Sequence, residues 1–136
     1  MKNLFISEND EITIKFVLAE TKTGKLLAEN SKEVLNAVHD DLVNQSTIEE
    51  HEVVFRRPSF GDLVKLTGNI NLDSSASVNF NPFAIRSIRM SNLIKRWTLL
   101  DEDGKTKAAT AETVAKLNPI IANVIGSQLE TELGNV

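Results

Sequence analysis

An acidic turn is the first place in this sequence where side chains could bind a cation. The run DEDG at residues 101–104 brings three carboxylates next to a glycine, and calcium prefers clustered oxygen ligands around a sharp bend. The spacing does not fit an EF-hand, because the glycine comes at the fourth position of the loop instead of the sixth, and the match of Glu112 to the twelfth position is weak evidence. The sequence therefore favours a solvated turn, with no metal site.

The two histidines are the other candidates for metal binding or acid–base chemistry. His39 is followed by two aspartates, and His51 lies between Glu50 and Glu52. Histidine and carboxylate groups serve in zinc sites and in proton transfer, but such sites need several of these groups from converging elements. Two histidines on separate elements do not provide them, so exposed histidines are the favoured interpretation.

Short motifs of enzyme active sites are absent from the sequence. There is no serine in a GxSxG setting, no GxxxxGK phosphate loop and no GxGxxG turn. There is also no cysteine, which removes thiol nucleophiles, thiolate zinc sites and disulfides together. The chain is accordingly predicted to be non-enzymatic, with no catalytic residue, cofactor or metal.

Charge divides the chain into a basic middle and acidic flanks. Residues 56–96 carry seven bases and two acids, a net charge of +5, whereas the rest carries eight bases and 17 acids, a net charge of −9. Such a separation can steer an acidic partner to one face, and it also allows copies of the chain to meet as a homo-oligomer. The simpler alternative is that the charges only solvate opposite faces of a small domain.

The basic segment also raises the question of nucleic-acid binding. Four bases within residues 86–96 fall on one expected helix, and Trp97 or Phe80 could stack on a base. Trp97 follows the apolar stripe of that helix, however, and the overall charge of −4 weakens phosphate binding. Nucleic-acid binding is therefore the least favoured of the binding functions.

Patterning in the first half of the chain predicts an antiparallel sheet. Ile12, Ile14, Phe16 and Leu18 alternate with the residues between them, as in a strand with one buried face. The stretch TKTGK at residues 21–25 predicts a turn into a short second strand at residues 26–28. Residues 48–57 are expected to be extended as well, until Pro58 ends the strand.

A helix is expected between the second and third of these strands. Asn30 or Ser31 can cap its first turn, and it should end near residues 44–46. The apolar residues that recur at helical spacing in this segment are Val34, Leu35, Val38 and Leu42.

The second half of the chain is predicted to be mainly helical. Ser59 is expected to cap a short helix that ends at Gly68, before a polar loop at residues 69–81. Pro82 then opens the longest expected helix, and Thr110 and Asn118 cap two further helices, the last reaching Leu133. The stripe of the longest helix comprises Met90, Leu93, Ile94, Trp97 and Leu100.

Together these elements predict an α+β fold, with a small N-terminal antiparallel sheet of two to four strands and a helical C-terminal half. The length fits a single domain over residues 1–136, in which residues 1–58 are strand-rich with one helix and residues 59–136 are mainly helical. No apolar run approaches the roughly 20 residues of a membrane-spanning helix. The N-terminus lacks the apolar region of a signal peptide, so no membrane partner is expected.

The residue types of protein interfaces gather beside the apolar stripe of the basic segment. Methionine, tryptophan and arginine are enriched at the centres of interfaces, and Met90, Arg96 and Trp97 lie at one edge of the stripe. An ordinary position in the core remains the favoured alternative for Trp97.

Three segments of the chain are FRRPSFGDLVKL (55–66), IKRWTLLDEDGK (94–105) and LNPIIANVI (117–125). In this order they resemble small tail-assembly chaperones and related morphogenesis proteins of tailed bacteriophages. In such proteins an extended segment ending at an RP or RRP junction precedes a short helix. A tryptophan-bearing helix, an acidic glycine turn and a terminal helix then follow.

The resemblance implies a non-enzymatic viral protein of virion morphogenesis, made in the host cytoplasm, that binds tape-measure or tail-tube subunits and prevents their premature aggregation. Such a chaperone needs exposed apolar anchors ringed by charge. The residues we assign to this role are Phe60, Phe83, Met90 and Trp97 as anchors, with Arg57, Arg89 and Arg96 as the surrounding charge. The alternatives are a structural virion component (a connector, baseplate or tail-completion protein) and the nucleic-acid binder considered above.

Overall fold

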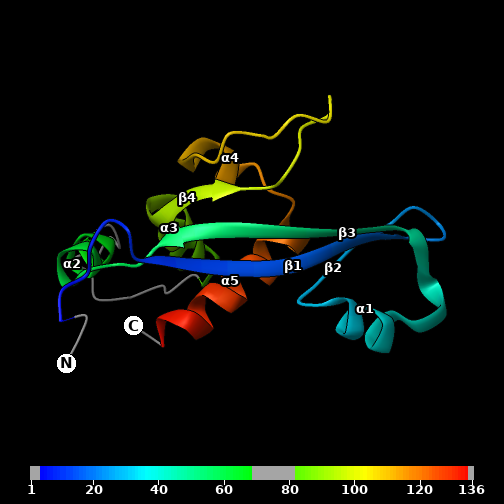
Figure 1. Cartoon of the computed structure of the whole chain (residues 1–136), viewed down its shortest axis with the longest axis horizontal. Coiled ribbons are helices and arrows are strands. Elements are labelled where there is room, and N and C mark those ends of the chain that lie inside the picture. Colours follow the sequence, from blue (N-terminus) through cyan, green and yellow to red (C-terminus); the bar gives the residue numbers. More distant parts are fainter. Residues whose placement is uncertain (1–3, 69–81, 135–136) are drawn as a thin grey trace, which may run out of the picture.

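Four antiparallel strands form a sheet in the computed structural model, which describes residues 4–68 and 82–134 (Figure 1). The strands are β1 (Glu11–Thr21), β2 (Leu26–Glu29), β3 (Val43–Arg56) and β4 (Ile94–Trp97), in the order β2-β1-β3-β4. The helices are α1 (Lys32–His39), the 3-10 turn η1 (Asp40–Leu42), α2 (Phe60–Gly68), α3 (Pro82–Leu93), α4 (Ala111–Ala115) and α5 (Pro119–Leu133). This arrangement confirms the predicted α+β fold. The loop expected at residues 69–81, with Phe80, lies outside the described residues.

The main core lies between the sheet and the helices of the second half. Alternation along β1 directs Ile12, Ile14 and Phe16 inward, as their spacing predicts, whereas β3 buries the three consecutive residues Val53, Val54 and Phe55. The largest fully buried side chains of this cluster are Ile14, Phe16 and Phe55 of the sheet with Met90, Leu93, Ile125 and Leu129 of α3 and α5. Residues from both halves of the chain therefore bury one another.

A second, smaller cluster holds α1 at the far end of the long β1–β3 pair (Figure 1). Val17 and Ala19 of β1 alternate with the core residues and pack with Val43 of β3. Leu35 of α1 completes this cluster and is 0% exposed. β1 is therefore apolar on both faces where this second cluster forms.

The predicted helix caps are confirmed. Ser31, Thr110 and Asn118 each accept a hydrogen bond from a backbone amide in the first turn of the helix that follows. Pro119 occupies the first turn of α5, where its missing amide costs nothing. These signals depend only on side chains and backbone groups a few residues apart.

The predicted extent of α1 is wrong. The helix ends at His39, because Asp40 adopts a positive φ of 33°, and β3 begins at Val43 instead of residue 48. Of the four apolar residues at helical spacing, only Leu35 is buried. Val38 is 63% exposed, because the sheet contacts only one side of this short helix, and Leu42, in η1 after the helix, is 61% exposed.

The predicted long basic helix is also wrong, because α3 stops at Leu93 and the chain continues as strand β4. β4 pairs with β3 with Val53 opposite Trp97 and Val54 opposite Arg96. The spacing of four residues between Leu93 and Trp97 fitted a helical stripe. Pairing with β3 satisfies the backbone of this segment and still buries Trp97, so tertiary contacts override the local pattern. Among the described residues α5, with 15 residues, is longer than α3, with 12.

Candidate protein-binding surface

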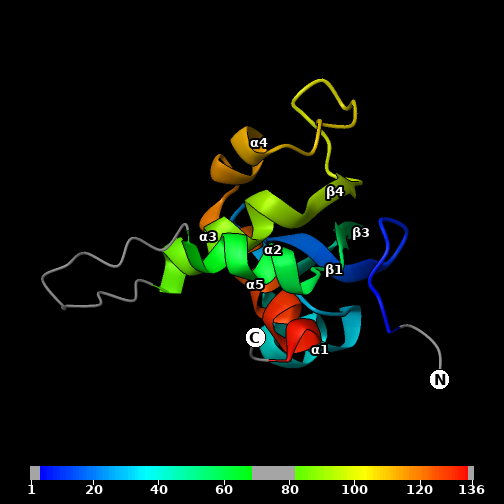
Figure 2. The same cartoon turned by 90° about the vertical axis from the view of Figure 1, so that its left-hand side faces the viewer.

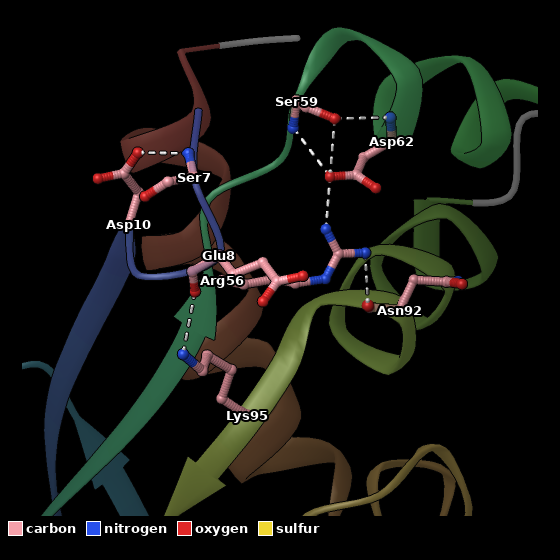
Figure 3. Close-up of polar contacts among 8 residues, drawn as sticks. All are labelled: Ser7, Glu8, Asp10, Arg56, Ser59, Asp62, Asn92 and Lys95. Carbon is pink, nitrogen blue, oxygen red and sulfur yellow. Dashed lines mark hydrogen bonds and ion pairs between the residues drawn. The ribbon is translucent and has the colours of Figure 1, made fainter. Parts of the chain in front are cut away.

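The RRP junction is the point where β3, α2 and α3 meet (Figure 3). Arg56 Nη1 forms an ion pair with the Asp62 carboxylate, and Arg56 Nη2 donates to the Asn92 carbonyl at 3.3 Å. The same carboxylate accepts hydrogen bonds from the amide and hydroxyl of Ser59 at 2.9 and 3.0 Å. Ser59 Oγ in turn accepts from the Asp62 amide at 3.2 Å, so the two residues cap α2 reciprocally. Arg56 therefore connects β3 with α2 and α3.

These contacts lower the pKa of the Asp62 carboxyl from 3.8 to about 2, mainly through the Ser59 amide and then through Arg56. Because the pKa is depressed in the folded state, the stability that the carboxylate contributes is fully present only above its unfolded pKa of 3.8. This stability is lost as the pH falls through about 2.

We expect Asp62→Asn to destabilise the chain at pH 7 by about 1 kcal/mol, the usual scale of a lost helix cap. The difference from the wild type should shrink as the pH falls from 3.8 toward 2, where the carboxyl becomes protonated. Thermal unfolding across this pH range would measure it, with Glu102→Gln in the exposed turn as the control. A stability difference that does not change with pH would contradict this explanation.

Several other bases of the basic segment also bind residues within the chain. Arg96 forms a bidentate pair with Glu11 at 2.7 and 2.9 Å, and Lys95 reaches the same carboxylate at 2.7 Å. Arg96 first, and then Lys95, lowers the pKa of Glu11 to about 2. Arg86 of α3 binds Glu130 of α5 at 3.0 Å. Much of the positive charge expected to attract a partner is thus compensated inside the fold.

The approach of α3 to α5 explains a glycine in the middle of α5. The stem of Arg86 crosses α5 at Gly126, where an added Cβ would lie 2.1 Å from Arg86 Cδ. From this position the guanidinium reaches Asn123 Oδ1 at 3.0 Å as well as Glu130. The absence of a side chain at residue 126 lets the two helices share these charged groups.

The structure separates the residues assigned to partner binding. Met90 and Trp97 are buried in the main core, and Trp97 Nε1 donates to the Lys107 carbonyl. The core alternative for Trp97 is therefore confirmed, and the expectation that Met90 and Trp97 are exposed anchors is wrong. Arg96 precedes Trp97 in β4, so the two side chains point to opposite faces of the sheet.

Phe60 and Phe83, in contrast, are exposed as predicted, and Phe60 is 83% exposed. Val64 lies one helical turn after Phe60 on α2 and is exposed as well. Arg57 precedes this helix and is partly exposed, as is Arg89 on α3. We name Phe60 and Val64, with the flanking cations Arg57 and Lys65, the Phe60 surface.

The Phe60 surface belongs to the end of the molecule opposite α1 (Figure 1), and Figure 2 views the molecule from this end. The N-terminal segment adds further apolar groups here, because Ile6 lines a hollow of about 570 Å³ together with Arg57 and Ser59. Phe5, the residue before Ile6, is exposed. Neither Phe5 nor Val64 was assigned to partner binding from the sequence. Helical periodicity does not show whether Val64 is buried or exposed, and Phe5 belongs to no periodic segment.

A cleft of about 840 Å³ lies between β3, residues 97–107 and the junction of α4 with α5. His51 lines it with a side chain that is 8% exposed and stacks on Phe16. His51 Nε2 lies 2.9 Å from Glu49 Oε2. His39 is partly buried too, 3.0 Å from Glu29. The prediction of exposed histidines is therefore wrong. His51 pairs with Glu49 and not with Glu50 or Glu52, because residues two apart on a strand share a face.

His51 also connects the cleft to a hydroxyl group. Its Nδ1 lies 3.0 Å from Thr98 Oγ1, so hydroxyl, imidazole and the Glu49 carboxylate follow one another as in nucleophilic catalysis. Thr98 Oγ1 accepts from the Glu52 amide at 3.0 Å and lies 3.4 Å from the Glu52 carbonyl oxygen. The Thr98 hydroxyl thus provides the Glu52 amide of β3 with an acceptor at the point where β4 has ended. These bonds give it a structural role.

In the acidic turn at residues 101–105, the Asp101 carboxylate forms hydrogen bonds to backbone amides of the turn itself. Asp101 Oδ1 accepts from the amides of Asp103 and Lys105 at 2.9 and 3.0 Å, and the Asp101 amide donates to the Lys105 carbonyl. Gly104 supplies the positive φ of 77° that closes the turn. Within residues 4–68 and 82–134, no three histidine, aspartate or glutamate side chains are grouped to hold a metal ion.

Comparisons with known protein families, with curated proteins and with solved structures find no match for this chain. In the part of the chain that the structure describes, none of the helices combines the length and apolar character required to cross a bilayer. The function of the chain is therefore inferred from its own sequence and surfaces.

Proposed function

We propose that this chain is a non-enzymatic protein-binding module that acts in phage tail assembly and covers an apolar segment of a tape-measure or tail-tube subunit in the host cytoplasm. The Phe60 surface is the observation that supports protein binding. An aromatic residue that is 83% exposed, beside exposed Val64, is unfavourable in water unless a partner covers it. The tail setting is supported only by the resemblance of residues 55–66, 94–105 and 117–125.

The chemistry of the Phe60 surface fits a helical partner with an apolar stripe and acidic flanks. Phe60 and Val64 are one turn apart on α2, so they can interdigitate with side chains of a second amphipathic helix. Arg57 and Lys65 flank them, and neither forms an ion pair with another described residue. These cations are available to attract acidic residues at the rim of the contact.

Replacing both apolar residues, as Phe60→Ser with Val64→Ser, is expected to weaken binding to the tape-measure or tail-tube subunit by at least about tenfold. Folding should survive, because both side chains are exposed. Co-purification of the tagged chain with each co-expressed subunit would measure this effect. Ile120→Ser removes an exposed apolar side chain from α5 and serves as the matched control.

Unchanged capture of the subunit by the Phe60 and Val64 double variant would refute the assignment of this surface. Mass spectrometry of purified virions distinguishes the two morphogenesis functions, since a chaperone is absent from them and a structural component is present. Retention of the chain on DNA that weakens steeply with salt would instead indicate the nucleic-acid binder.

A further inference from the structure

A second exposed apolar surface lies on α1 and the η1 turn that follows it, at the other end of the molecule. Val34 and Val38 lie one helical turn apart on α1, and Leu42 follows in η1, beyond the end of the helix at His39; all three are exposed. Leu35, on another side of α1, is fully buried and seats the helix on the sheet. The stripe is thus held in a defined position while it faces solvent. We name these three residues the α1 stripe.

The charges around the α1 stripe are mainly acidic. Glu33 lies in the first turn of α1, and Asp40 and Asp41 follow the helix, all with exposed side chains. Lys32 is the only exposed cation in residues 32–42, and His39 is bonded to Glu29. Exposed Lys22 also lies beside Leu42, because its amide donates to the Leu42 carbonyl, so three acids and two cations surround the stripe. The stripe therefore carries the charge opposite to that of the Phe60 surface, where Arg57 and Lys65 are the flanking groups.

We propose that copies of this chain associate head to tail, with the α1 stripe of one copy packed on the Phe60 surface of the next. Each surface presents apolar side chains spaced one helical turn apart, and their flanking charges are complementary. Contact between two α1 stripes would bring acids against acids, and contact between two Phe60 surfaces would bring cations against cations. A contact between two copies therefore buries one α1 stripe against one Phe60 surface.

The position of the two surfaces determines the type of assembly. They lie at opposite ends of the β1–β3 pair (Figure 1), so the contact is heterologous and leaves one surface open on each terminal copy. Such contacts build rings or open filaments instead of closed two-fold dimers. This association uses the Phe60 surface, so a bound subunit and a second copy would compete for it. The inference itself does not depend on the identity of that subunit.

Sedimentation velocity of the purified full chain would test the proposal. The wild type should form oligomers that grow with concentration, and they should weaken when salt is raised from about 0.05 M to about 0.5 M, which screens the flanking charges. The stripe variant Val38→Ser with Leu42→Ser, and the surface variant Phe60→Ser with Val64→Ser, should each raise the dissociation constant at least about tenfold. Ala37→Ser, about 100° around α1 from Val38, and Ile120→Ser should both behave as the wild type.

Mixing the two variants is the decisive measurement. The stripe variant keeps an intact Phe60 surface and the surface variant keeps an intact α1 stripe, so the mixture should form a 1:1 heterodimer that does not grow further. A mixture that stays monomeric would overturn the proposal, as would a wild type that stays monomeric at all concentrations. Oligomers of either variant alone would also overturn it, since they indicate a homotypic or unrelated contact.

Self-association and capture of the tape-measure or tail-tube subunit can be measured separately in the stripe variant. The stripe variant should lose self-association while it still captures the tape-measure or tail-tube subunit, because its Phe60 surface is intact. Capture without self-association in the wild type overturns only the head-to-tail contact. Self-association without capture overturns only the proposed function.

Discussion

Replacing Trp97 with alanine is expected to lower the free energy of unfolding by about 3–5 kcal/mol. Trp97 is 6% exposed, faces the main core from β4 and lies opposite Val53 of β3. Its indole also donates to the Lys107 carbonyl, which ties residues 98–107 to the sheet. The substitution therefore creates a cavity and leaves this carbonyl without its indole partner.

Chemical denaturation of the Trp97→Ala variant would measure the loss, and Trp97→Phe separates its two causes. Phenylalanine keeps much of the buried area but cannot donate a hydrogen bond, so its cost should be smaller, about 1–3 kcal/mol. A Trp97→Ala variant with unchanged stability that has lost a partner would return Trp97 to the interface and contradict the core position.

Leu35→Ala is expected to have the second largest effect, about 2–5 kcal/mol. Leu35 is the one residue of α1 with a fully buried side chain, and it packs with Val17 and Val43 in the small second cluster. A helix of only 8 residues has little intrinsic stability in water, so without Leu35 it should detach from the sheet.

The matched control for Leu35→Ala lies on the same helix. Val38→Ala removes an exposed side chain, so its cost should stay within about 0.5 kcal/mol. Amide hydrogen exchange would show whether the damage is local, with α1 amides losing protection before those of β1 and β3. Equal effects of the two substitutions would contradict the description of α1 as a helix held by one buried residue.

The sequence predicts local features of the fold better than it predicts the position of Trp97. The period of two from Ile12 to Leu18 is sufficient to predict β1, since it reflects which face of a single strand is buried. Caps at Ser31 and Thr110 are equally local, because a hydroxyl satisfies amides only three residues away. The burial of Trp97 could be favoured from its type, but its place on a strand could not be derived from its helical spacing.

The candidate site could be predicted only in part, for the same reason. Phe60 and Phe83 were expected to be exposed and are, whereas Met90 was expected beside them and is buried. All three are apolar residues on helices, and nothing in the local pattern tells them apart. What separates them is whether the sheet or another helix covers the side of the helix on which each one lies.

The sequence by itself determined strands β1 and β2, the C-terminal part of β3, the helix caps and the division into a strand-rich first half and a mainly helical second half. These properties arise from interactions between neighbouring residues. Only the tertiary structure decided that residues 94–97 join β3 as a strand, that Arg56 and Arg96 bind Asp62 and Glu11, and that the α1 stripe faces solvent. Several of these outcomes depend on contacts between residues far apart in the chain, which a periodic pattern does not encode.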